Sequence, residues 1–454
     1  MDESALTWCK RLVGCRSVST DGTREISALC ARELFAPAGI HPQVLASGED
    51  PRQVNLFAVI RGDDPAAAPL VLNTHLDTVP PGDHALWTRC GGDPFMANVT
   101  DGRIYGLGVA DTKLDFVAKA LALISCGVPH RNVYLIATFG EERGLLGAKE
   151  LAASGRLPRG ALAYIGEASH LQVITAHKGL MAFELEIHFE PARLESKAFA
   201  RIVFDGRAAH SSTPRLGRNA IRAALAVVTA HPNSEMRAIN GGDAVNKVPA
   251  RCELLITADP IAFPKGERIE SAPLHRIPAR AFAALNRFII ELENFADRAG
   301  PAEPDYAAPT MTCNAGEVSS SECALTLRFE LRPPPGLALD VASSGALAIV
   351  ERLAPGYPEL RMTTRQLRAN PGFRSRLDGA TVELAMAALA HAGLPLDQGV
   401  KAGCTEAGVY AAAGLEPVVF GPGPSTGVIH TPNEYNFLDD VDRAMRFYRE
   451  LLKL

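Results

Sequence analysis

Carboxylates and a histidine follow apolar stretches of the sequence in several places. Glu141 and Glu142 come directly after the apolar run in NVYLIATFGEERG, and His75 and Asp77 end the run in PLVLNTHLD. Asp111 lies in GLGVADTK, a glycine-rich turn that opens a helical pattern. Adjacent carboxylates repel each other and resist burial unless a positive charge offsets them. These residues therefore either face water or surround a cation.

Glu167 in YIGE and His430 in GVIHTPNEY extend this set. Zinc binds imidazole nitrogen and carboxylate oxygen, and two divalent ions about 3.5–4 Å apart can share a carboxylate and a water. Asp111 is the candidate for the shared carboxylate. One of the adjacent glutamates could bind metal while its neighbour acts as the base. An HxD or a Glu-Glu pair alone is common on surfaces, so the conjunction of all these residues predicts a hydrolytic two-metal site.

Strand and helix patterns alternate around these residues. Strands alternating with helices predict an α/β domain, with a mostly parallel sheet and helices on both faces. In such sheets, functional residues gather at the carboxyl ends of the strands, where the candidate residues are expected to lie. The predicted strands are Val54–Ile60, Pro69–Asp77, Val133–Phe139 and Ala161–Glu167, and the predicted helices are Asp115–Gly127 and Leu146–Gly155.

The pattern changes at about residue 180. LMAFELEIHFE alternates apolar and polar residues, as does an antiparallel strand with one wet face. The following β-α-β-β-α-β order predicts a ferredoxin-like α+β domain, with an extra insertion at about residues 260–310 that contains one helix. The α/β pattern returns near residue 371. We therefore predict one α/β domain formed by residues 1–179 and 369–454, interrupted by an inserted domain of residues 180–368.

Composition and charge argue against a nucleic-acid-binding, membrane or secreted protein. The 454 residues carry a net charge of −5 with no basic stripe, so nucleic acid is not an expected partner. No apolar run approaches the roughly 20 residues that span a bilayer, so no membrane association is expected. The N-terminal sequence lacks the apolar core of a secretory signal, and the nine scattered cysteines include no CxxC pair. These features predict a cytoplasmic protein with reduced thiols.

The sequence resembles the M20 family of metallopeptidases and deacylases over nearly its whole length. The motifs that carry the resemblance are NTHLDTVPPGD, WTRCGGDPFMANVTDGRIYGLGVADTK, ATFGEERGLLGAKE, YIGE, GRAAHSSTPRLGRNAI, GCTEAGVY, VVFGPG and IHTPNEY. The sequence departs from the family at Leu107, where an Arg is common, and at Leu114, where a Gly is common. Neither departure falls on a candidate metal ligand.

The resemblance implies a dizinc catalytic domain, although cobalt or manganese would suit similar ligands. It assigns His75 and Glu167 to one metal, Glu142 and His430 to the other, Asp111 to both, Asp77 to the orientation of His75, and Glu141 to the role of general base.

The resemblance also implies that the inserted domain is a lid that closes over the site and forms the interface of a homodimer. His210, in RAAHSSTP, would stabilise the oxyanion. Family members often hold the substrate's carboxylate with an Asn and an Arg about a dozen residues apart, and this sequence departs from that spacing. We expect Asn246 and Arg332, on the two sides of the extra insertion, to meet in space and bind the carboxylate instead. Thr405 and Glu406, in GCTEAGVY, would lie by the substrate pocket.

The expected activity is hydrolysis of the amide bond of an N-acyl amino acid by a metal-activated water, as in acetylornithine deacetylase or the desuccinylases of the family. A dipeptidase or carboxypeptidase on the same chemistry is the alternative. A catalytically silent relative that binds metal is less favoured, because Glu141 and all the ligand positions are present. A small N-acyl amino acid or a short peptide is therefore the expected substrate.

Overall fold

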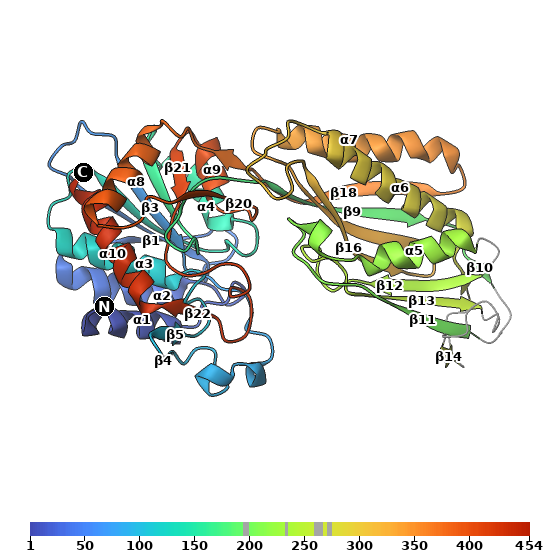
Figure 1. Cartoon of the computed structure of the whole chain (residues 1–454), viewed down its shortest axis with the longest axis horizontal. Coiled ribbons are helices and arrows are strands. Elements are labelled where there is room, and N and C mark those ends of the chain that lie inside the picture. The colour runs from blue at the N-terminus through green and yellow to red at the C-terminus, as the bar shows by residue number, and fades with distance from the viewer. Residues whose placement is uncertain (194–198, 232–234, 258–266, 270–274) are drawn as a thin grey trace. The chain divides into compact units, whose positions relative to one another are not determined.

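The computed structural model describes residues 1–193, 199–231, 235–257, 267–269 and 275–454. The chain divides into two compact units, one made of Met1–His177 and Phe373–Leu454 and the other of Lys178–Gly372 (Figure 1). The predicted boundaries, after residues 179 and 368, lie close to these divisions. Part of the predicted extra insertion, residues 258–266 and 270–274, lies outside the described residues. None of the described helices combines the length and apolar character that crossing a membrane requires.

The discontinuous unit, called here the catalytic unit, is built on a nine-stranded sheet. Its central strands β6, β3, β7 and β21 are parallel, which confirms the predicted α/β core. The sheet as a whole is mixed, because the pairs β1–β2, β2–β6, β21–β8 and β8–β19 are antiparallel. The main path of the sheet runs β1 (Gln43–Ala46), β2 (Val54–Ile60), β6 (Val133–Thr138), β3 (Leu70–His75), β7 (Leu162–Gly166), β21 (Glu416–Val419), β8 (Val173–His177) and β19 (Phe373–Arg374), with β20 (Gln398–Lys401) paired to β8.

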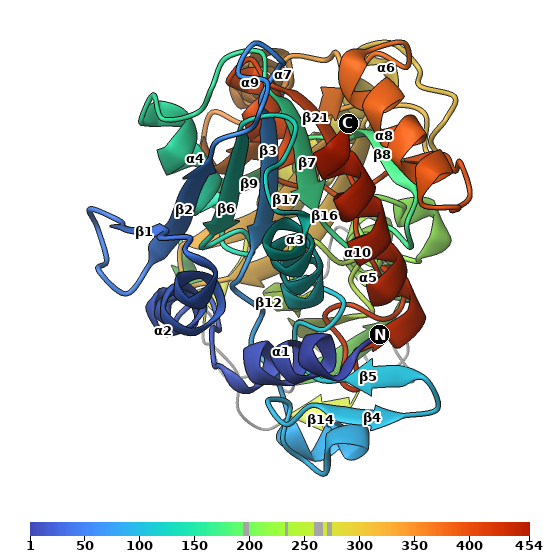
Figure 2. The ribbon, with the colours of Figure 1, turned by 90° about the vertical axis from the view of Figure 1, so that its left-hand side faces the viewer.

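Helices cover both faces of this sheet because its central strands are apolar on both sides. In β3, Leu70 and Leu72 join one hydrophobic core and Val71 joins another, as the period of two requires. The first core also receives α1 (Glu3–Gly14), α3 (Lys113–Cys126), α8 (Ala380–His391) and α10 (Leu438–Lys453), which Figure 2 shows over one face of the sheet. The second core receives α4 (Leu146–Ala153) and α9 (Ala407–Ala412).

A buried ion pair ties α3 to the central strands. Lys119 Nζ lies 2.7 Å from Asp115 Oδ2, and both side chains are fully buried. Lys119 also donates hydrogen bonds to the carbonyl of Asn73 in β3 and the carbonyl of Tyr164 in β7. Tyr448 of α10 donates to the other oxygen of Asp115 at 2.6 Å. The pair therefore fixes both strands close to their carboxyl ends.

We expect Lys119→Met to destabilise the catalytic unit by about 3–5 kcal/mol, because it leaves the Asp115 carboxylate buried without a cation. Urea unfolding followed by tryptophan fluorescence, with a chelator present, measures this unit alone, since Trp8 and Trp87 are the only tryptophans and both lie in it. The exposed Lys10→Met is the control. A loss below about 1 kcal/mol, the scale of exposed ion pairs, would show that the pair contributes little.

The second unit, called here the inserted unit, has an eight-stranded sheet where the ferredoxin-like prediction counted four strands. Three helices, α5 (Ala220–Ala230), α6 (Ala279–Arg298) and α7 (Leu339–Leu353), pack on it in one hydrophobic core. Helix α6 is the helix predicted within the extra insertion. The strands run in the order β14 (Glu267–Ile269), β11 (Phe199–Asp205), β13 (Arg251–Thr257), β12 (Met236–Gly241), β16 (Thr312–Ser320), β17 (Ala324–Arg332), β9 (Leu180–His188) and β18 (Arg361–Asn370).

Candidate metal centre

Parallel strands bring the candidate residues of the catalytic unit to one edge of the sheet. In the register of β3 with its neighbours, His75 lies opposite Thr138 of β6, and Thr74 lies opposite Gly166 of β7. His75 therefore ends its strand beside the turn that carries Glu141, and Glu167 follows β7 directly. Only glycine fits at position 166, because a Cβ there would collide with Asp115 Oδ2.

Two groups of potential metal ligands lie at this edge. His75, Glu141 and Glu167 form the first, and Asp111, Glu142 and His430 form the second; within each group the ligand atoms lie within 4.8 Å of one another. His75 Nε2 is 3.9 Å from Glu167 Oε1, and His430 Nε2 is 3.0 Å from Glu142 Oε1. The structure thus brings together all the predicted metal ligands.

Asp111 lies between the two groups. Its Oδ1 is 3.2 Å from His75 Nε2, and its Oδ2 is 2.9 Å from His430 Nε2. The two oxygens of this single carboxylate thus face imidazoles of different groups, which is the arrangement that a bridging ligand needs. Glu141, predicted as the base, groups with His75 and Glu167 closely enough that the three could hold one cation. The geometry therefore allows Glu141 to act either as the base or as a metal ligand.

The electrostatics of the site favour bound cations. Burial raises the pKa of Glu141 well above its usual value, and the charges of Glu142 and Glu167 raise it further. Burial would lower the pKa of His430, but its hydrogen bonds with Asp111 and Glu142 raise it to about 11. Protonated imidazoles would thus offset the carboxylates when no metal is bound. The nitrogen and oxygen donors fit zinc, and divalent cations would offset the same carboxylates with the imidazoles neutral.

Asp77 holds the turn that carries the adjacent glutamates. Its carboxylate accepts hydrogen bonds from the backbone N–H of Glu141 at 3.1 Å, from that of Glu142 at 3.3 Å and from the Ser19 hydroxyl at 2.7 Å. The backbone carbonyl of Asp77 lies 3.0 Å from His75 Nδ1, while its carboxylate is 3.6 Å away, too far for a good hydrogen bond. Since a carbonyl only accepts, Nδ1 carries a proton and Nε2 is the nitrogen available to a metal.

Glu434 is a buried residue of the site that the sequence analysis did not single out. Its Oε1 accepts the backbone N–H groups of Ala110 and Asp111, at 2.8 and 3.0 Å, and its Oε2 accepts that of Gly108. Glu434 therefore fixes the turn that presents the Asp111 carboxylate. Its position in IHTPNEY, four residues after His430, was the available signal, but only the fold brings it to the Asp111 turn.

We expect Glu434→Gln to weaken metal binding by about 10- to 100-fold, the usual cost of losing a group that orients a ligand. Glutamine offers one acceptor oxygen in place of two, so one N–H group of the turn loses its partner. Titration with zinc against a chelating indicator measures the affinity, and the exposed Glu383→Gln of α8 is the control. Affinity equal to that of the control would show that the turn holds its shape without Glu434.

The geometry at His210, in the inserted unit, suits an oxyanion donor. His210 is exposed, and its Nδ1 accepts the backbone N–H of Ser212 at 3.2 Å, with the Ser212 hydroxyl 2.6 Å away. Because Nδ1 accepts, the neutral ring carries its proton on Nε2. A donor of this kind can stabilise negative charge that develops on a carbonyl oxygen.

Asn246 and Arg332 share a neighbour in the inserted unit. The backbone carbonyl of Asn246 accepts the N–H of Ser211 at 3.0 Å, and Arg332 Nε lies 3.3 Å from the Ser211 hydroxyl. Arg332 Nε also donates to Glu330 at 2.6 Å. Among the described residues, the terminal nitrogens of Arg332 form no hydrogen bond, and burial followed by the charge of Arg332 lowers the pKa of Lys178 to about 8. The terminal nitrogens of Arg332 could therefore bind a carboxylate in the planar, two-bond geometry that a guanidinium offers.

Thr405 and Glu406, predicted beside the substrate, are buried, and they contact residues of the sheet. Glu406 Oε2 accepts hydrogen bonds from Asn73 Nδ2 and the Thr138 hydroxyl, at 2.5 and 2.8 Å, and burial raises its pKa to about 7. The backbone N–H of Thr405 donates to His177 Nε2 at 3.1 Å. Both residues thus hold strands β3, β6 and β8 in place, and neither side chain is exposed.

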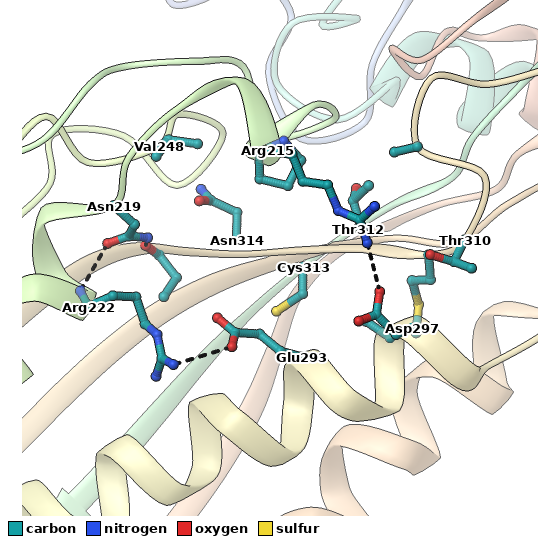
Figure 3. A pocket seen from close by; sticks show the side chains of 15 residues that line it. Arg215, Asn219, Arg222, Val248, Glu293, Asp297, Thr310, Thr312, Cys313 and Asn314 are labelled. Atoms are coloured by element: carbon teal, nitrogen blue, oxygen red, sulfur yellow. Dashed lines mark hydrogen bonds and ion pairs between the residues drawn. The ribbon is translucent and has the colours of Figure 1, made fainter. Parts of the chain in front are cut away.

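A cavity of about 290 Å³ lies between α5, α6 and the start of β16 in the inserted unit (Figure 3). Its charged side chains face one another: Arg222 lies 3.5 Å from Glu293, and Arg215 lies 3.5 Å from Asp297 (Figure 3). Arg215 and Arg222 thus pair with the cavity's own carboxylates through their terminal nitrogens. Arg332 pairs with Glu330 through Nε, and among the described residues its terminal nitrogens form no hydrogen bond, so Arg332 is the stronger candidate for binding a carboxylate.

The sequence matches peptidase family M20/M25/M40 over residues 71–454. The acetylornithine deacetylase of Photorhabdus laumondii is 32% identical over 271 residues, which cover 55% of this chain and 64% of that protein. The acetylornithine deacetylase of Klebsiella pneumoniae is 32% identical over 249 residues, 50% of this chain and 58% of that protein. The matches thus cover less than two thirds of these curated relatives.

Solved structures resemble the fold over almost the whole chain. The aminoacylhistidine dipeptidase of Vibrio alginolyticus aligns with a TM-score of 0.69 at 16% identity, over 99% of this chain and 96% of that one. An M20 metallo-carboxypeptidase of Sulfolobus solfataricus aligns with a TM-score of 0.62 at 17% identity, over 100% and 99%. Both likenesses confirm the predicted fold class.

Proposed function

The chain belongs to peptidase family M20/M25/M40, and we propose that it is a dinuclear metal-dependent hydrolase that cleaves the amide bond of N-acyl amino acids. The observation that carries this proposal is the position of Asp111, whose two oxygens face the imidazoles of two separate ligand groups. Bound divalent cations, zinc by the choice of donors, would make a water molecule more acidic and polarise the scissile carbonyl.

The residues of the chain have distinct tasks in this proposal. Glu141 takes the proton of the attacking water and delivers it to the leaving amine. His210 donates a hydrogen bond from its Nε2–H to the oxyanion, and Arg332 holds the carboxylate of the amino acid. The metal-binding tasks fall to His75 and Glu167 for one cation, to Glu142 and His430 for the other, and to Asp111 for both.

A dipeptidase or carboxypeptidase is the second candidate. The likeness to an aminoacylhistidine dipeptidase and to a metallo-carboxypeptidase, each over nearly the whole chain, favours it. The same residues would cleave either class of amide, because the reacting bond and the carboxylate of the product are alike. The part of the substrate before the scissile bond distinguishes the two candidates.

The test is the release of free amine from a panel of N-acetyl, N-succinyl and N-formyl amino acids and simple dipeptides, with added zinc or cobalt. Glu141→Gln serves as the blank. Turnover of acyl amino acids that the blank lacks supports the first candidate, and turnover of dipeptides alone supports the second. Two metal ions in a chain that turns over nothing on the panel would favour a silent relative.

We also propose that the protein is cytoplasmic and forms a homodimer. All nine cysteines lie among the described residues and none of them forms a disulfide, which suits a reducing cytoplasm. Val341 and Leu347 of α7 are 46% and 45% exposed, which suits a homodimer formed through the inserted unit. A monomer in sedimentation at micromolar concentration would overturn the homodimer.

We expect Arg332→Lys to raise KM about 10- to 100-fold for substrates with a free α-carboxylate, because lysine keeps the charge but loses the planar pair of donors. Substrates whose carboxylate is amidated should be little affected. Arg328→Lys is the matched control, since Arg328 lies on the same face of β17 and also pairs with glutamate. Equal KM changes for both kinds of substrate would rule out a contact between Arg332 and the carboxylate.

A further inference from the structure

Lys401 contacts a candidate metal ligand, and the proposed mechanism gives it no task. It ends β20, which pairs in parallel with β8. Its Nζ lies 2.7 Å from Glu167 Oε2, and its side chain is only 16% exposed. Among the described residues, Lys401 is the one lysine or arginine that forms an ion pair with a candidate metal ligand.

The two oxygens of Glu167 have different partners. Oε1 faces His75 Nε2 in the first ligand group, at 3.9 Å, and Oε2 accepts the Lys401 ammonium. A carboxylate can bind a metal through one oxygen or through both, and a short charge-assisted hydrogen bond occupies one of them. The lysine thus leaves Oε1 as the oxygen that points toward His75.

We propose that Lys401 is a positioning residue, which orients Glu167 so that Oε1 alone binds the metal shared with His75. This inference rests on the proposed two-metal function. Ligating carboxylates are commonly held by a second group, whose loss costs about 10- to 100-fold in metal affinity. The ammonium also places one positive charge beside the cluster of carboxylates, which reduces their mutual repulsion.

A nearby lysine lacks this geometry. Lys113 follows Asp111 by two residues and is fully buried, but its Nζ donates to the backbone carbonyl of Cys15 at 2.9 Å. Lys113 therefore holds the main chain of α1's C-terminal turn, whereas Lys401 acts on a ligand side chain. A buried lysine near the site therefore does not necessarily contact a metal ligand. Lys401 differs from Lys113 because it contacts the Glu167 side chain.

The experiment compares Lys401→Met and Lys401→Arg with the wild-type chain by zinc titration against a chelating indicator and by the visible spectrum of the cobalt-loaded protein. Lys453→Met is the matched control, because Lys453 lies in the same unit and forms a 2.7 Å ion pair with Glu450 at the surface. We expect Lys401→Met to weaken one of two metal sites about 10- to 100-fold and to change the cobalt spectrum. Lys401→Arg should restore most of the affinity, since it keeps the charge.

Other outcomes would overturn the proposal. Unchanged affinity and an unchanged spectrum in Lys401→Met would show that Glu167 needs no partner, and tighter binding would show that the lysine competes with the metal. Equal weakening of both sites would indicate a general structural defect. If Lys401→Met does not fold, a Lys401→Arg chain with wild-type stability and weak binding at one site would still overturn the role of charge. A wild-type chain that binds no metal would instead overturn the proposed function itself.

Discussion

Glu141→Gln should lower kcat by about 10²- to 10⁴-fold, the usual contribution of a general base, and leave both metals bound. Glutamine has nearly the same shape as glutamate but cannot accept the proton of the attacking water. The turn around residue 141 should survive, because Asp77 binds it through the backbone N–H groups of Glu141 and Glu142. The measurement pairs kcat on the best substrate of the panel with zinc per chain after dialysis.

The metal content decides between two roles for Glu141. Its carboxylate groups with His75 and Glu167, so a ligand role predicts that Glu141→Gln loses metal along with activity. Glu142→Gln is the control, because Glu142 contacts His430 and should lose metal. Turnover near the wild-type rate in Glu141→Gln would remove the residue from the mechanism altogether.

The sequence predicted that the metal ligands lie close together, because their positions depend mainly on the order of strands and helices in the sheet. Apolar runs marked the buried strands, and strand–helix alternation implied that their carboxyl ends share an edge. Asp111 and His430 lie in loops, and the resemblance of their motifs to a known family placed them at the site. The resemblance also supplied the division of tasks between Glu141 and Glu142, which the spacing of two adjacent glutamates leaves open.

Supporting residues were harder to predict because their partners are distant in the sequence. Glu434 binds backbone N–H groups more than 300 residues away, and Lys401 binds Glu167 across 234 residues. The motif that contains Glu434 places it near His430 but gives no sign of the Asp111 turn, and the spacing of Lys401 gives no sign of Glu167. The motif of Glu406 suggested a place near the substrate, and the contacts of Glu406 are with Asn73 of β3 and with Thr138 of β6, the residue opposite His75.

The inserted unit shows where strand patterns fail. Strands β12 and β16 contain Asn and Gly within MRAING and TCNAGEVSS, residue types that are unfavourable in strands. Their neighbours in the sheet provide the pairing that their composition does not favour, since β12 pairs with β13 and β16, and β16 also pairs with β17. The strong alternation in β17, with Leu325, Leu327 and Phe329 in the core, was readable from the sequence.

Asp111→Asn should remove both metals, whereas loss of any other ligand should remove mainly one. One oxygen of Asp111 faces His75 and the other faces His430, at 3.2 and 2.9 Å. Asparagine replaces one of these acceptors with an NH₂ donor that cannot bind a cation, and it also removes the negative charge between the two sites. Activity should fall below detection, because the water and the carbonyl both depend on bound metal.

The number of zinc ions per chain, measured at equal free zinc, distinguishes the loss of both metals from the loss of one. Asp111→Asn should retain well under one ion per chain, while His430→Ala should retain about one, because His430 belongs only to the second group. Asp378→Asn, which removes an exposed carboxylate paired with Arg376, should retain the wild-type content. If Asp111→Asn kept one ion bound tightly, Asp111 would belong to a single site, and the other metal would have to be held by His75, Glu141 and Glu167 or by Glu142 and His430 without a shared carboxylate.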